Sequence, residues 1–152
     1  MLTCDLLGDE RPGLLPIVVG IHLDAELYDR PLASRLTDAI RHWQHAYCDG
    51  PICRPVVVSD ALYLSSDDLQ CRPVISLGHA RVNALSAGLV ERLPVIFTQR
   101  GRVAIQADLA ADPVCLCAWA VNECDGMDAV DRLIDVELDD FLESLAATAP
   151  AM

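Results

Sequence analysis

The chain of 152 residues contains no lysine. Its 11 basic residues are all arginine, and 23 aspartates and glutamates outnumber them, which gives a formal net charge of −12 at pH 7. A surface with this charge repels the phosphate backbone of DNA and RNA. We therefore expect no nucleic-acid partner, although a single arginine can still bind one phosphate or carboxylate group.

Long apolar runs and an export signal are also missing. No run reaches the roughly 18 residues that a membrane-spanning helix needs. The first residues, MLTCDLLGDE, lack the basic region and long apolar core of a secretory signal peptide. We expect a soluble cytoplasmic protein with no membrane partner, whose seven cysteines are reduced thiols.

The familiar catalytic motifs are absent as well. The sequence has no GxGxxG or GKS/T phosphate loop, no GxSxG nucleophile turn and no HExxH zinc motif. The reaction, and even whether the protein is an enzyme, is therefore left open by the sequence.

Apolar residues, by contrast, are abundant. They make up 53% of the chain and charged residues 22%, which is typical of a folded protein rather than a disordered one. The length favours a single domain over residues 1–152. Residues 1–13 and 147–152 are expected to be loose ends, because GDERPG interrupts the first segment and the last reads ATAPAM.

Strand and helix patterns alternate along the chain. Buried strands are expected at 16–23, 55–59, 72–78 and 114–121, a hairpin at 95–107, and helices at 31–47, 82–93 and 126–146. This alternation predicts an α/β fold: a three-layer α/β/α sandwich with a mostly parallel sheet of five or six strands. The hairpin, turning at Arg100-Gly101, is expected to add an antiparallel edge. Residues 24–30 are interpreted as a loop and 65–70 as a polar turn.

Helical spacing predicts the core-facing side chains of the two long helices. Steps of three and four residues give this set: Leu32, Leu36, Ile40, Trp43 and Tyr47 in the first helix, and Met127, Val130, Ile134, Leu138, Phe141 and Leu145 in the last.

Polar residues follow the expected strands, and parallel strands place their carboxyl ends at one edge of the sheet, where ligands bind. The segment SLGHARVNA runs from a strand through one glycine into a helix, so it points backbone N–H groups outward, which suits an anion. The residues expected to bind an anionic metabolite or nucleotide are Gly78, His79, Arg81, Asn83 and Asn122. A plain strand-to-helix turn remains the alternative.

His79 is the candidate general base at this edge, with Asp60 or Asp24 to orient it. Ser59 and Cys124 are candidate nucleophiles by position only. His22 and His79 with Asp24 and Asp60 would also suit a metal ion, but their spacing matches no known metal motif.

A second candidate metal site lies in RHWQHAYCDGPIC. His42, His45 and Cys48 share one face of the helix, and Cys53, folding back after the turn, would complete a tetrahedral zinc site. Exposed polar residues at a helix end are the alternative, and a site shared between two subunits is a third reading.

Two functions therefore stand side by side. The first is a small-ligand domain, enzyme or binder, with its ligand at the carboxyl ends of the strands. The second is a structural or assembly protein that forms a homo-oligomer or docks on a protein partner, with the candidate zinc site serving that contact.

Overall fold

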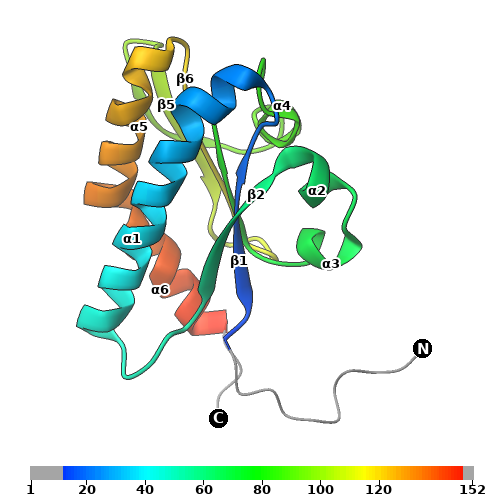
Figure 1. Cartoon of the computed structure of the whole chain (residues 1–152). Coiled ribbons are helices and arrows are strands. Elements are labelled where there is room, and N and C mark those ends of the chain that lie inside the picture. Colours follow the sequence, from blue (N-terminus) through cyan, green and yellow to red (C-terminus); the bar gives the residue numbers. More distant parts are fainter. Residues whose placement is uncertain (1–11, 149–152) are drawn as a thin grey trace.

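The computed structural model describes residues 12–148. Of the loose ends expected at 1–13 and 147–152, residues 1–11 and 149–152 therefore lie outside the described residues. Within residues 12–148, six strands form one mixed sheet in the order β2-β1-β3-β6-β5-β4. The strands are β1 (Leu14–Val19), β2 (Arg54–Ser59), β3 (Val74–Leu77), β4 (Val95–Gln99), β5 (Val103–Asp108) and β6 (Cys115–Ala120). Helices cover both sides of this sheet (Figure 1). The predicted α/β sandwich is confirmed.

The strand directions also match the expectation. β1 pairs in parallel with β2 and β3, and β3 with β6, whereas β5 and β4 continue the sheet as antiparallel strands. The β4–β5 turn has φ of 52° at Arg100 and 68° at Gly101. Two consecutive positive φ values define the two-residue hairpin turn that matches the twist of the strands. The predicted antiparallel edge is therefore confirmed.

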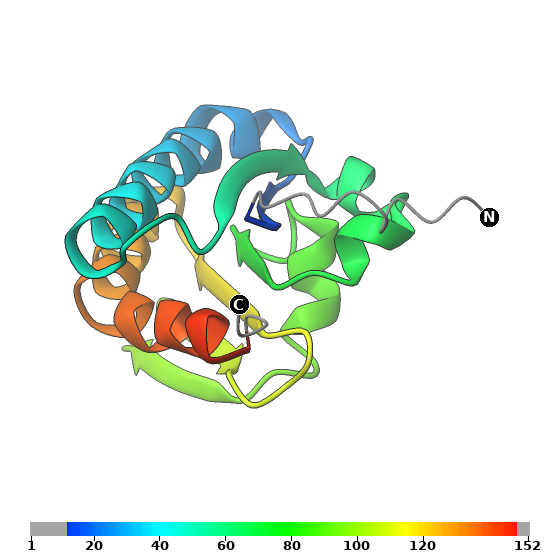
Figure 2. The ribbon, with the colours of Figure 1, turned by 90° about the horizontal axis from the view of Figure 1, so that it is seen from below.

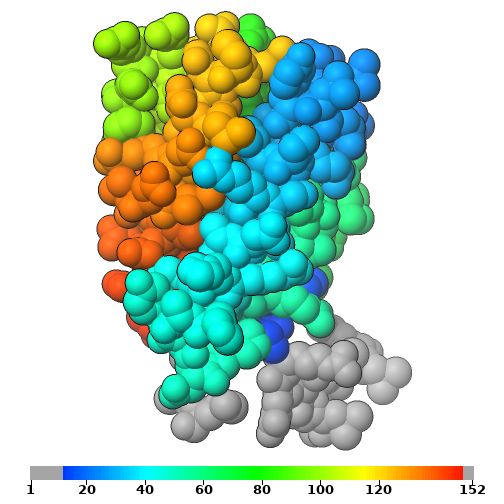
Figure 3. Space-filling model, turned by 60° about the vertical axis from the view of Figure 1, so that its left-hand side comes forward, coloured from blue at the N-terminus to red at the C-terminus, as the bar shows by residue number. Residues whose placement is uncertain are grey.

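One side of the sheet, here called the long-helix face, is covered by two long helical segments. The first is α1 (Arg30–Tyr47), and the second runs without a break through α5 (Gly126–Arg132), the π-helical turn η4 (Leu133–Glu137) and α6 (Leu138–Thr148). Figure 3 shows their outer surfaces side by side. They bury apolar side chains against the strands, among them Leu36, Ile40, Leu133 and Phe141. This face holds most of the apolar core.

Two predicted core positions are wrong. Tyr47 is 75% exposed and Met127 is 47% exposed. At the end of α1 the buried position belongs to Gln44, whose Oε1 accepts hydrogen bonds from the N–H groups of Ile52 (2.6 Å) and Cys53 (2.9 Å). The segment at Ile52 and Cys53, which leads from α1 to β2, thus packs on the Gln44 side of the helix, and Tyr47 is left exposed to solvent.

The opposite side, here called the short-helix face, carries α2 (Asp60–Leu64), α3 (Asp67–Gln70) and α4 (Ala84–Leu89). Seen from below, the two helical layers flank the sheet (Figure 2). The segment 65–70 is not only a polar turn, because Ser66 Oγ caps α3 by accepting from Leu69 N at 3.2 Å, and Leu69 is buried.

The ends of the described chain are tied to the fold. Gly13 O accepts a hydrogen bond from Arg54 N at 2.8 Å, and residues 147–148 belong to α6. The expected loop at 24–30 is instead the π-helical turn η2 (Ala25–Asp29), which leads directly into α1. This correction matters for the site, because it fixes the direction of Asp29.

Candidate functional site

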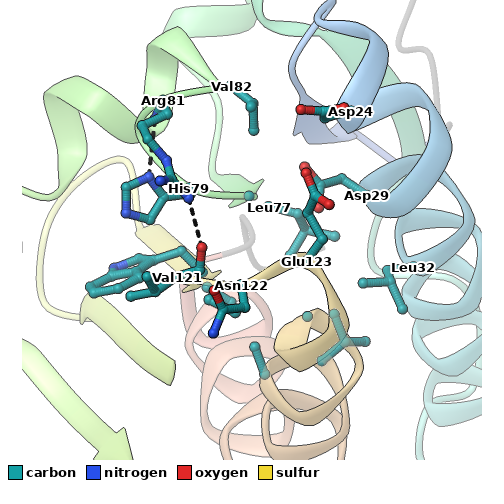
Figure 4. A pocket seen from close by; sticks show the side chains of 17 residues that line it. Asp24, Asp29, Leu32, Leu77, His79, Arg81, Val82, Val121, Asn122 and Glu123 are labelled. Atoms are coloured by element: carbon teal, nitrogen blue, oxygen red, sulfur yellow. Dashed lines mark hydrogen bonds between the residues drawn. The ribbon is translucent and has the colours of Figure 1, made fainter. Parts of the chain in front are cut away.

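The carboxyl ends of β1, β3 and β6 meet at one edge of the sheet. The chain leaves β1 toward α1 on the long-helix face, but it leaves β3 toward α4 on the short-helix face. Connections that diverge in this way open a crevice between adjacent parallel strands, and ligands of open α/β sheets bind there. A pocket lies at this point, lined by the segments that follow these three strands (Figure 4). It is called the switch-point pocket below.

The switch-point pocket is small. Its enclosed volume is about 40 Å³. Such a space holds a few water molecules or one small polar group, whereas whole metabolites occupy pockets of roughly 300–1,000 Å³. Leu32, Leu77 and Val130 form apolar parts of its wall. The geometry therefore suits the head group of a ligand rather than an entire nucleotide.

One side of the pocket is acidic. Asp24, Asp29 and Glu123 line it, and in Figure 4 the carboxylates of Asp29 and Glu123 point toward each other. Burial, and then the negative charges of Glu123 and Asp24, raise the pKa of Asp29 from 3.8 to about 6. Within residues 12–148 the Asp29 carboxylate has no hydrogen bond and no ion pair. It is thus a half-buried carboxylate whose pKa lies well above the ordinary value for an aspartate.

Gly78 makes room for this carboxylate. Its φ of 112° is a conformation that side-chain-bearing residues rarely adopt, and Asp29 Oδ2 lies 2.5 Å from the place where a Cβ would stand. A substitution here would strain the backbone and push the Asp29 carboxylate aside.

The opposite side of the pocket is basic and aromatic. Arg81 Nη2 donates to the carbonyl of Val121 at 2.7 Å, and the backbone N–H of Arg81 donates to His79 Nδ1 at 3.1 Å. Burial and the charge of Arg81 lower the pKa of His79. A neutral imidazole that accepts at Nδ1 carries its proton on Nε2. The His79 ring stands edge-on to Trp119, with ring centroids 5.5 Å apart.

Most of the predicted site residues come together in this pocket. Gly78, His79, Arg81, Asn122 and Asp24 all line it. The predicted pairing of His79 with a carboxylate is not formed, since His79 Nδ1 accepts from Arg81. Asp24 instead lies 3.7 Å from His22 Nδ1.

Asn83 lies outside the pocket lining. Its side chain is buried, and its Nδ2 donates to Ser76 Oγ and to the carbonyls of Val18 and Leu77 at 2.8–3.2 Å. Its Oδ1 accepts the N–H groups of Leu85 and Ser86, which caps α4. These internal contacts occupy the amide and give Asn83 a structural role.

Asp60 is also held by backbone. Its Oδ1 accepts from Ile21 N (3.2 Å) and Ala61 N (2.8 Å), and its Oδ2 accepts from Ala84 N (2.8 Å). One buried carboxylate thereby joins the segment after β1, the start of α2 and the start of α4. No hydrogen bond connects it to His79 among the described contacts.

Sequence reasoning missed Asp29. The sequence predicts a loop at Asp29, but in the structure η2 leads directly into α1. Asp29 therefore lies one helical turn before Leu32 and Ala33, on the buried side of α1. An acidic residue at a position where the helical pattern demands an apolar one is the signal that could have revealed it.

The candidate metal residues are not assembled. Among residues 12–148 no three His, Cys, Asp or Glu side chains gather as ligands for one metal ion, either at the edge of the sheet or near α1. His42 and His45 are exposed, while Cys53 is buried behind Gln44. Burial and the neighbouring Cys48 raise the pKa of Cys53 to about 12.

Comparison with family models, with curated protein sequences and with solved structures finds no match for this chain. In the described part of the chain, no helix combines the length and the apolar character needed to cross a lipid bilayer.

Proposed function

We propose that this protein binds a small ligand whose cationic or hydrogen-bond-donating head group enters the switch-point pocket and meets Asp29 and Glu123. The Asp29 carboxylate carries the proposal. It is half buried, lacks a partner among the described residues, and has a pKa raised to about 6 by burial, Glu123 and Asp24. A bound cation or N–H donor would offset the cost of burying and crowding these charges.

Arg81 supports a second contact with the same ligand. One of its guanidinium N–H groups is bound to the carbonyl of Val121, and the others make no hydrogen bond within the described residues. A guanidinium with unused donors binds an acceptor such as a carboxylate. A head group that combines a donor and an acceptor, as in a small amine or amino acid, matches the two sides of the pocket.

The charge balance distinguishes this ligand from the anionic metabolite or nucleotide expected from the sequence. Asp24, Asp29 and Glu123 line the pocket against the single charge of Arg81. A phosphate dianion would meet three carboxylates at close range, which is unfavourable. A volume of about 40 Å³ also has room for a head group only, so a nucleotide could place no more than a part of itself inside the pocket. Anionic ligands are the alternative, and comparing amine probes with phosphate and AMP distinguishes the two.

The test is a titration followed by backbone amide NMR signals. The probes are ethylamine, glycine, inorganic phosphate and AMP. We expect glycine and ethylamine to shift the amides of Gly78 and Glu123 at pH 8. Affinity should fall as the pH drops through about 6, because Asp29 then takes up a proton. Asp29→Asn and Glu123→Gln should each weaken binding at least tenfold.

Glu143→Gln is the matched control, since Glu143 is an exposed acid on α6 outside the pocket. It should bind the amine probes as the wild type does. Binding of phosphate or AMP without the amines would contradict the proposed charge preference. No shift at the pocket with any probe would contradict ligand binding there.

A further inference from the structure

A second hollow lies on the short-helix face, away from the switch-point pocket. Its volume is about 530 Å³, and its walls come from α2, α4, the segment 108–113 and the first residue of β6. Pockets that enclose a small metabolite have roughly 300–1,000 Å³. It is called the α4 groove below, and it has room for a whole molecule where the switch-point pocket has room for a head group.

The floor of the α4 groove is apolar and is opened by a glycine. Leu85, Leu89 and Leu93 line it together with Gly88. A Cβ added at Gly88 would meet no atom within 4 Å. Glycine in the middle of a helix costs about 0.5–1 kcal/mol relative to alanine. Gly88 therefore lowers the stability of the helix. Because it has no side chain, no atoms project from this position into the groove.

Polar groups stand at one part of this groove. Tyr63 lines it and is only 5% exposed, yet its hydroxyl has no hydrogen-bond partner within residues 12–148. Burial raises the pKa of Tyr63 and of Cys115, and the positive charge of Arg92 opposes that shift in both residues. Arg92, Tyr63 and Cys115 all line the same groove. Arg92 forms no ion pair within the described residues.

Two acids, Asp108 and Asp112, also line the groove. Asp108 Oδ1 accepts the N–H of Ala110 at 3.1 Å, so this carboxylate is partly engaged with its own loop. The groove therefore offers one arginine and one unused tyrosine hydroxyl next to an apolar floor. Its two acids oppose any negative charge on a ligand, so a carboxylate binds here only through direct contact with Arg92 and Tyr63.

We propose that the α4 groove binds a small monocarboxylate with an apolar or aromatic body. The carboxylate meets Arg92 and the hydroxyl of Tyr63, and the apolar body lies beside Gly88 against Leu64 and Leu93, the lining leucines with exposed surface. Arginine and a tyrosine hydroxyl are suitable donors for a carboxylate, and the leucines supply the apolar contact. This site is independent of the ligand proposed for the switch-point pocket.

The test uses phenylacetate as the probe, with 2-phenylethanol and 2-phenylethylamine as neutral and cationic counterparts of similar shape. Phenylacetate is expected to shift the amides of Gly88, Leu89 and Cys115, and to bind at least tenfold more tightly than either counterpart. Arg92→Gln should remove this preference, while Arg100→Gln, at the exposed β4–β5 turn, should leave it unchanged.

Gly88→Leu is the second variant, because its side chain fills the groove without meeting any atom near Cβ. It should fold with at least wild-type thermal stability and lose phenylacetate binding. Wild-type affinity in folded Gly88→Leu or in Arg92→Gln would overturn the proposal, as would equal binding of the amine. Absence of any shift with phenylacetate at high millimolar concentration would overturn it too.

Discussion

The two helical layers cover the same sheet in different ways. The long-helix face buries the inner sides of two long helical segments, and its cluster of 21 buried residues includes Phe141 and most of the leucines and isoleucines of the core. The short-helix face buries a cluster of only eight residues under helices of four to six residues. The long-helix face is thus held by a large apolar core, whereas the short-helix face has a smaller core and leaves space above the sheet.

Polar contacts replace part of the missing apolar burial on the short-helix face. Ser76 Oγ and Ser86 Oγ are 2.8 Å apart, Cys117 Sγ lies 3.5 Å from Ser86 Oγ, and Asn83 joins this group. Gln106 donates to the carbonyls of Val90 and Leu93 and accepts from Trp119 Nε1. Directional bonds hold these short helices at fixed positions while leaving the α4 groove unfilled.

The largest expected effect is on the long-helix face. Phe141→Ala removes a fully buried ring from the large cluster and should lower the free energy of unfolding by about 3–5 kcal/mol. Leu69→Ala, in α3 on the short-helix face, should cost less, about 2 kcal/mol, because its surroundings are thinner and collapse more easily. Urea denaturation of both variants measures the difference. Equal losses would show that the two faces are equally dense in solution.

Asn83→Ala probes the polar contacts of the other face. It removes the cap of α4 and leaves buried partners unsatisfied, so it should cost about 2–3 kcal/mol. Asn122→Ala is the control, since that side chain is exposed and makes no capping bond; its effect should stay within about 0.5 kcal/mol. A loss below 1 kcal/mol for Asn83→Ala would mean that apolar contacts alone hold α4.

Asp29 provides the smallest effect, and one of opposite sign. Burial and the neighbouring acids raise its pKa from 3.8 to about 6, so the folded protein holds this proton more tightly than the unfolded chain. Stability contributed by Asp29 is therefore present below about pH 4 and is lost as the pH rises toward about 6. Asp29→Asn should unfold at a higher urea concentration than the wild type at pH 7.

After allowance for solvent screening, the gain in Asp29→Asn should be about 1–2 kcal/mol at pH 7 and close to zero at pH 4. Thermal or urea unfolding at both pH values measures it, with Glu143→Gln as the exposed control. A gain that is the same at both pH values would point to a cause other than ionisation.

The architecture could be predicted from the sequence because its signals are local. Apolar runs mark the buried strands, and Arg100-Gly101 marks the turn of the hairpin. The sequence was also sufficient for the edge of the sheet, since Gly78, His79, Arg81 and Asn122 follow their strands immediately. The direction of each polar side chain was not predictable. Asn83 and Asp60 turn inward to backbone groups contributed by distant segments, which no local pattern encodes.

The α4 groove could not be predicted from the sequence for a related reason. The sequence predicts a helix over 82–93, but α4 spans only Ala84–Leu89, where it contacts β3 and α2. How completely a short helix covers a sheet depends on its tertiary neighbours, which here are α2 and the segment 108–113.

Asp60 gives these two hollows a shared support. Its carboxylate holds the N–H of Ile21, next to the β1 connection that leads into the switch-point pocket, and the N–H of Ala84, which lines the α4 groove. The same carboxylate therefore fixes the position of both the segment at Ile21 and the start of α4. Removing the Asp60 carboxylate would therefore loosen a backbone segment beside each hollow at the same time.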